Sequence, residues 1–232
     1  MQPAQNFYPR LEAWNTPMDL DFLALLNAGN VTAQELELAQ CKEDPWRFLT
    51  HWVQTEDNQN TNQPFQPFPN DLHLQVLTKY WQHERFLLVP KSRQMTCTWL
   101  FAGLYLWDSM FYPSRLTMLQ CKIEEDADAN LKRMVTMWER LPDWMKEWQP
   151  MHYTYCAGEF PRSRSQVLAR PAGAKHFRQR TLTGVMLDEA AFTEGMDEVL
   201  AGAKHALGKV GRFTALSSAS PSYFGELVFD RT

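Results

Sequence analysis

The stretch FLLVPKSRQMTCTW, residues 86–99, passes from a short apolar run through a basic turn into a helical pattern. The run Phe86–Val89 is typical of a buried strand in a parallel sheet, and Thr98–Met110 predicts an apolar helix. A turn between such a strand and such a helix gathers backbone N–H groups at a helix N-terminus, where they can bind an anion. This one stretch therefore predicts an α/β fold with an anion-binding loop.

Further segments with the same alternation follow along the chain. Strand-like apolar runs lie at Arg115–Leu119, Gln166–Ala169, Gly184–Leu187 and Phe213–Leu216. Between several of them lie helical patterns, and the longest carries apolar residues at steps of three and four, namely Ala127, Leu131, Met134, Trp138 and Leu141. Short strands alternating with helices predict a parallel sheet covered on both faces, whose ligands bind at the carboxyl ends of the strands.

The beginning of the chain has the pattern of a separate helical part. Pro17–Ala28 has apolar residues at helical spacing, and Asp44 followed by proline predicts an N-cap at the start of another helix. The segment EDNQNTNQPFQPFPND, residues 56–71, is rich in Asn, Gln and Pro and predicts a linker. We therefore expect an N-terminal helical region at residues 1–62 and an α/β core at residues 63–232.

The composition excludes several classes of protein. With 44% hydrophobic and 13% aromatic residues among 232, the chain is globular rather than disordered or fibrous. No apolar run reaches the roughly 18–20 residues of a membrane span, and the first residues lack the layout of a secretion signal. The four cysteines form no CxxC pair and are expected to be reduced cytosolic thiols, and the six histidines show no metal-ligand spacing.

The charge is unevenly distributed. A net charge of −4 argues against a passive nucleic-acid coat, which is normally basic. Residues 160–184, however, contain six basic and no acidic side chains, so the rest of the chain carries −10 rather than −4. The six are Arg162, Arg164, Arg170, Lys175, Arg178 and Arg180. They could contact DNA, reach the nucleotide of a neighbouring subunit, or form a solvated loop, and the sequence leaves these alternatives open.

The basic turn after the first strand is an incomplete phosphate loop. The usual loop ends Gly-Lys-Ser/Thr, whereas this one ends Thr96-Cys97-Thr98. Thr98 can still offer a hydroxyl to Mg²⁺, and Lys91 can reach back to phosphates from the opposite end of the loop. Taken alone, such a turn is more often an ordinary solvated loop.

Two later strands also end in polar residues. Gly184–Leu187 leads into Asp188 and Glu189, which is the layout of a Walker B motif: one carboxylate for the Mg²⁺ shell and one to polarise the attacking water. Phe213–Leu216 leads into the hydroxyl-rich turn 217–220. Either feature alone could be a polar turn, but polar clusters at the ends of successive strands predict one shared site.

These segments together resemble the ATPase domain of a large terminase subunit, the motor that packages DNA into the heads of tailed phages. The resemblance covers residues 44–221. FLLVPKSRQMTCTW is similar to the family's variant phosphate loop (Walker A), GVMLDEAAF to its Walker B motif and ALSSASP to its coupling motif. It implies a three-layer α/β/α P-loop NTPase of the ASCE type, with a mostly parallel central sheet and an N-terminal helical extension.

The resemblance also implies roles for individual residues, with ATP and Mg²⁺ as cofactors. Lys91 would bind phosphate, and Thr98 and Asp188 would hold Mg²⁺. Glu189 would be the catalytic carboxylate, and Arg93 would neutralise charge on the γ-phosphate within the same subunit. The other residues expected to bind the nucleotide are Ser92, Gln94, Met95, Thr96 and Cys97.

Two further roles concern the ends of the site. Ser217 and Ser218 would sense the γ-phosphate and couple hydrolysis to movement. Gln66 and Gln75 flank the place where the family contacts adenine. The helix predicted at 71–81 occupies the same region, and its spacing predicts that Leu72, Val76, Leu77 and Tyr80 face inward.

The chain departs from the family pattern at two points. Thr96 stands where most members have glycine, and because a β-branched residue resists positive φ, we expect another loop conformation or weak nucleotide binding. The chain also stops at Thr232, soon after the coupling motif. We therefore expect an ATPase module without the C-terminal nuclease domain and without nuclease activity.

The resemblance implies double-stranded DNA, a portal protein and a small terminase subunit as partners, and a homo-oligomeric ring once assembled. It implies the cytoplasm of an infected bacterial host as the location, with no membrane association. Two other functions remain open: a helicase-like nucleic-acid translocase, and a catalytically weak docking module with a degenerate phosphate loop. Thr96 and Cys97 favour the second alternative.

Overall fold

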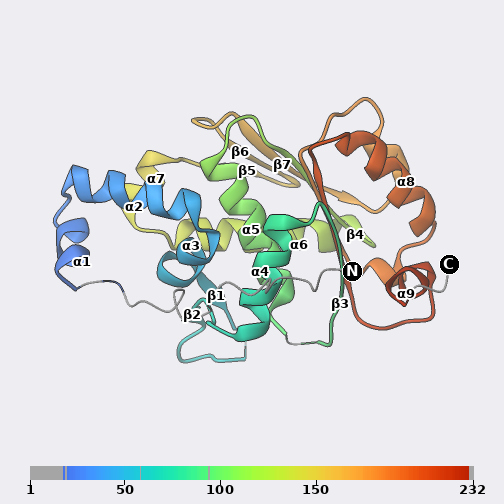
Figure 1. The fold of residues 1–232 in the computed structure, drawn as a ribbon, viewed down its shortest axis with the longest axis horizontal. Helices are drawn as coiled ribbons and strands as arrows, with labels where there is room; N and C mark the ends of the chain where they lie inside the picture. The colour runs from blue at the N-terminus through green and yellow to red at the C-terminus, as the bar shows by residue number, and fades with distance from the viewer. Residues whose placement is uncertain (1–17, 19, 58, 94, 230–232) are drawn as a thin grey trace, which may run out of the picture.

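The computed structural model describes residues 18, 20–57, 59–93 and 95–229. Its centre is a seven-stranded sheet with the order β3-β9-β8-β4-β7-β6-β5 (Figure 1). The first five strands in this order run parallel, and the last two pair antiparallel. The bounds are β3 (Phe86–Pro90), β9 (Arg212–Ser217), β8 (Gly184–Asp188), β4 (Leu116–Cys121), β7 (Ser165–Pro171), β6 (Ala157–Phe160) and β5 (His152–Thr154). The mixed α/β fold with a mostly parallel sheet is confirmed.

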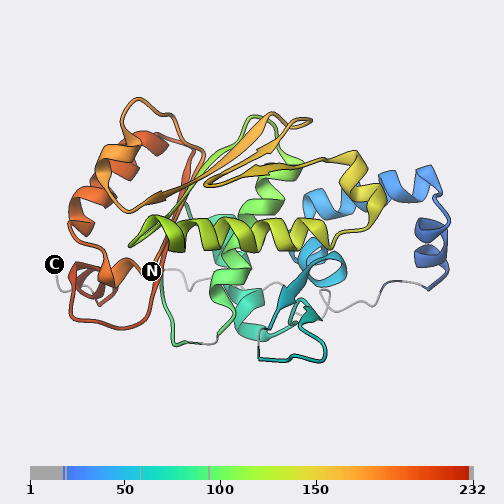
Figure 2. The ribbon, with the colours of Figure 1, turned by 180° about the vertical axis from the view of Figure 1, so that it is seen from behind.

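The sheet is covered by helices on both faces because its strands are apolar on both sides. In β8, Met186 belongs to one hydrophobic core, whereas Val185 and Leu187 belong to the other. The first core includes residues of α4 (Leu72–His83), α5 (Cys97–Phe111), α6 (Glu124–Glu139) and α7 (Asp143–Trp148). The second includes residues of η2 (Ala174–Phe177), η3 (Ala190–Phe192), α8 (Met196–Leu207) and α9 (Tyr223–Val228). Figure 2 shows α6 running across α5 on the first face.

Each apolar run predicted as a strand is a strand, whereas β5 and β6 lie outside the sequence prediction. All three residues of β5 are exposed, and β6 has only four residues. Neither therefore shows the continuous apolar run that marks a buried strand. No helix within the described ranges is long and apolar enough to cross a membrane.

The N-terminal helices are α1 (Leu20–Asn27), α2 (Val31–Glu43) and α3 (Pro45–Trp52), and α1 and α2 lie at the end of the molecule opposite α8 and α9 (Figure 1). The predicted N-cap is confirmed, because the Asp44 side chain accepts a hydrogen bond from the Trp46 amide. Residues 1–17 and 19 of the predicted helical region lie outside the described residues.

An ion pair between the buried Glu37 and the half-buried Arg47 joins α2 to α3. Glu37 is fully buried, and its carboxylate accepts hydrogen bonds from Arg47 at 2.9 and 2.6 Å and from the Trp52 indole at 2.7 Å. Helix α3 in turn meets α5 closely, since a Cβ added at Gly103 would lie 2.6 Å from the Leu49 Cδ2. The N-terminal helices therefore share the first hydrophobic core with the sheet-covering helices.

The segment predicted as a linker, residues 56–71, overlaps a short hairpin that begins at Gln54. Its strands are β1 (Gln54–Glu56) and β2 (Phe65–Pro67), which pair antiparallel. Composition predicts a loop here because Asn, Gln and Pro dominate, but it does not report the pairing of the two ends. Residue 62 lies between the paired strands, and the division of the chain at that point stays a prediction.

The inward face predicted for α4 is confirmed only in part. Leu77 packs against the first core and Val76 is half-buried, but Leu72 is 59% and Tyr80 52% exposed. The fully buried residues of α4 are Leu74, Gln75, Thr78 and Trp81. Two polar side chains can be buried here because each has a partner: the Thr78 hydroxyl donates to the Leu74 carbonyl, and the Gln75 amide donates to the Asn70 side chain. An apolar edge of α4 is thereby left facing the loop that follows β3.

Candidate active site

Side chains from two strand ends converge at the carboxyl edge of the sheet. The Thr98 hydroxyl, in the first turn of α5, donates a 3.0 Å hydrogen bond to the Asp188 Oδ2 at the end of β8. The Lys91 Nζ, just after β3, lies 3.8 Å from the Asp188 Oδ1 and 3.6 Å from the Glu189 Oε1. The four residues that the sequence places at separate strand ends thus form one cluster.

A third strand end holds this cluster together. β9 lies between β3 and β8 in the sheet, and Ser217 is its last residue. The Ser217 carbonyl accepts a 2.9 Å hydrogen bond from the Lys91 amide, and its Oγ accepts one of 3.1 Å from the Ala191 amide. Ser217 is fully buried, whereas Ser218 is half-buried. One serine therefore connects the loop after β3 to the turn after β8.

Two site residues have left-handed backbone conformations. Thr96, which precedes α5, has φ 56° and ψ 5°, and Glu189 has φ 55°. The loop therefore adopts the conformation that glycine favours although a β-branched residue occupies the position, which corrects the expectation of another loop conformation. A left-handed conformation costs a residue with a Cβ roughly 1–2 kcal/mol. Such strain is often found at functional sites.

Two adjoining hollows flank the loop. The first, of about 250 Å³, is lined by Lys91, Ser92, Met95, Thr96, Cys97, Thr98, Trp99 and Arg133. The second, of about 660 Å³, is lined by Lys91, Met95 and Cys97 from the same stretch, by Val89 and Pro90, and by Asp71, Leu72, His73, Val76 and Leu77. No described residue that lines the first hollow is acidic and two are cationic, so it suits an anion. The second is larger and mainly apolar.

The cysteine in the loop is an inert thiol. Cys97 is buried and its Sγ donates to the Met95 carbonyl at 3.5 Å. Burial raises the pKa of Cys97, and the nearby Lys91 ammonium opposes this only in part. Burial, followed by the charge of Asp188, raises the pKa of Cys121 to about 12. Both thiols therefore stay protonated at neutral pH and are poor nucleophiles.

Several residues expected at the nucleotide are not among the described residues that line the two hollows. Gln94 lies outside the described residues, and Arg93 is exposed and is not among the described residues that line either hollow. The half-buried Gln66 donates its amide to the Gln63 carbonyl, and the buried Gln75 donates to Asn70. Neither glutamine is among the described residues that line the hollows. The structure therefore gives neither a place beside the loop.

The six basic residues of the 160–184 segment do not form one cluster. Arg162 and Arg164 precede the seven-residue strand β7, and Lys175 follows it, so the two ends are separated by about 20 Å of extended chain. The Arg170 guanidinium, on β7, donates to the Ala169 carbonyl. Arg162 lies over the Trp148 ring, 5.3 Å from its centroid. A single basic surface made of this whole segment is therefore absent from the described part of the chain.

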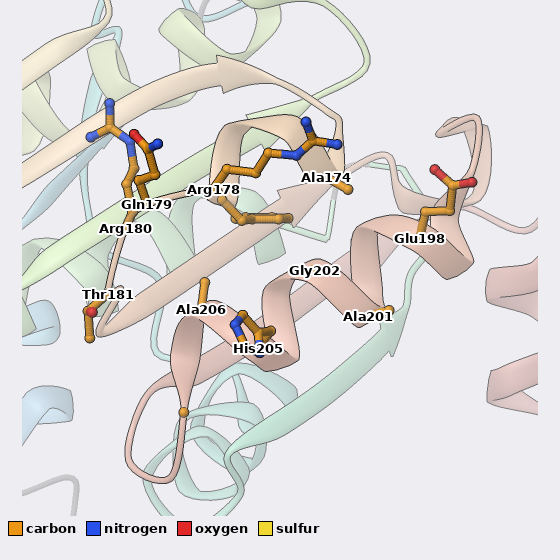
Figure 3. Close-up of a pocket in the computed structure, with 12 residues that line it drawn as sticks. Ala174, Arg178, Gln179, Arg180, Thr181, Glu198, Ala201, Gly202, His205 and Ala206 are labelled. Atoms are coloured by element: carbon orange, nitrogen blue, oxygen red, sulfur yellow. The ribbon is translucent and has the colours of Figure 1, made fainter.

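Arg178 and Arg180 line a groove of about 920 Å³ between the loop after η2 and α8 (Figure 3). The α8 side presents Glu198, Ala201 and Gly202, together with His205 and Ala206. This groove shares none of its described lining residues with the two hollows beside the phosphate loop. It is therefore separate from the Lys91–Asp188 cluster.

Several residues that line the hollows are not among the site residues predicted from the sequence, and His73, Trp99 and Arg133 are three of them. His73, on α4, lies with Nε2 3.1 Å from the Met95 carbonyl, and Trp99 and Arg133 line the smaller hollow. Trp99 follows the loop directly and belongs to the same predicted segment. His73 and Arg133 reach the loop through the packing of α4 and α6, which no local pattern reports.

Comparisons with known proteins establish the fold class. No protein-family model matches the chain, and no curated protein sequence matches it. Solved structures do match, and they share the mixed α/β fold of this chain. More particularly, it is the fold of the ATPase domain of phage large terminases.

Three structures illustrate the likeness. A mutant ATPase domain of the Thermus phage P74-26 large terminase has 15% identity and a TM-score of 0.51, over 67% of this chain and 68% of that one. The HK97 bacteriophage large terminase has 13% identity and a TM-score of 0.58, over 73% and 36%. A large terminase from another thermophilic bacteriophage, in complex with ADP, has 10% identity and a TM-score of 0.54, over 70% and 42%. The chain thus spans less than half of the latter two proteins.

Proposed function

We propose that this chain is the ATPase part of a viral DNA-packaging motor, which couples hydrolysis of Mg-ATP to the movement of double-stranded DNA into a procapsid. The observation that carries the proposal is the convergence of Lys91, Thr98, Asp188 and Glu189 at the carboxyl edge of the sheet. The fold shared with phage terminase ATPase domains supports it.

The two hollows suit the two ends of ATP. The phosphates would lie in the smaller hollow, between the Lys91 ammonium and the N-terminus of the 15-residue helix α5. The base would lie in the larger hollow, against Leu72, Val76 and Leu77. His73 is placed at the junction of the two, which makes it a candidate for a base contact in place of Gln66 and Gln75.

The donor atoms at this point fit Mg²⁺. A hydroxyl and a carboxylate oxygen already lie 3.0 Å apart in Thr98 and Asp188, and hard oxygen atoms are the ligands that Mg²⁺ prefers. Both residues would hold the ion together with phosphate oxygens. When bound, Mg²⁺ neutralises charge on the phosphates and orients them.

Lys91 has two sets of anionic partners available to it. In the structure its ammonium is paired with Asp188 and Glu189. ATP phosphates offer a stronger anionic partner at the same loop, so binding would draw the ammonium away from Glu189. The freed carboxylate, whose side chain is 40% exposed, could then orient water and accept its proton. Nucleotide binding would in this way activate the base.

The coupling and partner roles follow from the same proposal. Ser217, which is hydrogen-bonded to both the loop and the turn after β8, would sense the γ-phosphate together with Ser218. Arg178 and Arg180, at the rim of the separate groove, are candidates for contact with DNA or with a neighbouring subunit. The portal protein and the small terminase subunit would complete the motor, with several copies of the chain forming a ring.

The test is ATP hydrolysis by the wild type and by Glu189→Ala, each assembled with double-stranded DNA and a portal. We expect the wild type to hydrolyse ATP at a rate well above that of Glu189→Ala. A wild type that binds the assembly yet hydrolyses no faster than Glu189→Ala would contradict the proposal. Unwinding of duplex DNA by the wild type would instead indicate a helicase-like translocase.

A further inference from the structure

Arg133 is the second cation of the smaller hollow. It lies in the middle of α6 and reaches the same hollow as Lys91, Ser92 and the first turn of α5. Its guanidinium lies 5.9 Å from the centroid of the Trp99 ring, and Trp99 is itself part of that first turn. The position results from α6 crossing α5 (Figure 2). A residue 35 positions after Thr98 is thereby brought to the phosphate loop.

The Arg133 side chain is held in place but keeps free donors. Its Nη1 donates a 2.6 Å hydrogen bond to the Asn130 Oδ1, and Asn130 is 2% exposed. Trp99, which packs against the first core, supports the guanidinium from another side. Arg133 forms no ion pair with any described acidic residue. Since a guanidinium has five N–H donors, most of them are left for a ligand.

We propose that Arg133 binds the phosphates of the bound nucleotide directly and is the arginine of this site. This inference rests on the proposed function. A planar guanidinium binds phosphate oxygens in a bidentate manner, and anchoring by Trp99 and Asn130 reduces the entropy lost on binding. Arg93, the arginine expected from the sequence, is exposed and lacks this support. Arg133 takes the role that the sequence assigns to Arg93.

The experiment measures binding of ATP and of inorganic tripolyphosphate, by competition with a fluorescent ATP analogue. Tripolyphosphate can occupy only the phosphate end of the site. Arg133→Gln is expected to weaken both ligands by the same factor, about tenfold, because the lost contact involves phosphate alone. The affinities of Arg133→Lys should lie between those of the wild type and those of Arg133→Gln, since an ammonium keeps the charge but not the bidentate geometry.

The matched control is Arg140→Gln. Arg140 also lies at α6, as its C-cap, and stacks over the Phe65 ring instead of lining the hollow. It should leave both affinities unchanged. Arg93→Gln should weaken ATP less than Arg133→Gln does, and the reverse order would overturn the inference.

The outcomes separate this inference from the proposed function. A wild type that binds neither ATP nor tripolyphosphate contradicts the proposed function itself. If the wild type binds both ligands, and Arg133→Gln and Arg133→Lys bind them as tightly as the wild type does, only the role of Arg133 is overturned. A loss for ATP without a loss for tripolyphosphate also overturns it, because that pattern would indicate a distorted base site and a structural role.

Discussion

The Thr98 hydroxyl and the Asp188 carboxylate are hydrogen-bonded at 3.0 Å, although 90 positions separate them in the sequence. The bond joins the first turn of α5 to the last residue of β8, so the phosphate loop and the acidic strand end are parts of one site. Both are oxygen donors of the kind a hard cation prefers. The ligand set is therefore assembled before any ligand arrives, which lowers the cost of ordering it on binding.

Glu189→Gln should abolish hydrolysis and spare nucleotide binding. The amide keeps the shape of the side chain but cannot accept a proton, so hydrolysis should fall about 10²–10⁴-fold. ATP affinity should stay level or rise, because the ion pair with Lys91 is lost. Phosphate release and equilibrium titration measure the two quantities. A parallel fall in affinity would place Glu189 in binding rather than catalysis.

Lys91→Ala should weaken ATP binding far more than Cys97→Ala does. The first substitution removes an ammonium from the anion-binding hollow, with an expected loss of about tenfold or more, whereas the second removes a protonated, buried thiol. Nucleotide titration of the two variants makes the comparison. Equal losses would show that Lys91 is not the phosphate lysine.

Thr96→Gly should be at least as stable as Thr96→Ala. Both substitutions remove the same polar and branched atoms, but only glycine removes the backbone strain at a φ of 56°. Glycine also raises the conformational entropy of the unfolded chain, which opposes this gain in stability. The balance favours Thr96→Gly by up to about 1 kcal/mol in the free energy of unfolding. Urea denaturation tests this, and a clearly less stable glycine variant would show that the left-handed conformation is not strained.

Ser217→Ala should destabilise the fold, whereas Ser218→Ala should not. The first substitution leaves the buried Ala191 amide without its partner, at a cost of about 1–3 kcal/mol. Ser218 is half-buried, and its replacement should stay within about 0.5 kcal/mol. Denaturant midpoints of the two variants decide. Similar midpoints would mean that the Ser217 hydroxyl does not support the turn after β8.

His176→Gln should reduce the loss of stability on mild acidification. Burial, and then the charges of Lys175 and Arg170, lower the pKa of His176 in the folded protein, with Arg180 acting the same way and Glu124 opposing them. As pH falls below the ordinary value of 6.5, the unfolded chain therefore binds the proton more readily, and stability is lost. Urea midpoints at about pH 5 and about pH 7.5 measure the difference. An identical difference in the variant would contradict this contribution.

The sequence predicts the five parallel strands of the sheet and four side chains of the site because the signals are local. Lys91, Thr98, Asp188 and Glu189 each stand next to an apolar strand or helix, and parallel strands bring their carboxyl ends to one edge. The hydroxyl of Ser217 follows the same rule. The order of the strands along the sheet then places β9, which ends at Ser217, between β3 and β8.

The remaining site residues depend on packing between helices, which has no local signature. Arg133 lies beside an apolar stripe of a correctly predicted helix, but only the crossing of α6 over α5 brings it to the loop. His73 lies beside the loop because α4 buries Gln75 and Thr78 and exposes Leu72. The hydrophobicity of these side chains alone predicts the opposite orientation of the helix. Arg93 and Gln66 stand at plausible sequence positions, yet their side chains are exposed or bonded elsewhere.

The position of β9 also fixes when the site can exist during synthesis. Among the described strands β9 is the last to be made, yet it is the neighbour of both β3 and β8. A nascent chain that ends after α8 already contains the lysine, the threonine and both carboxylates, but lacks the strand that lies between β3 and β8 and pairs with both. Closing that gap requires contacts between distant parts of the chain, which form slowly. The cluster that joins the ends of β3 and β8 can therefore be complete only after β9 has been synthesised and inserted between them.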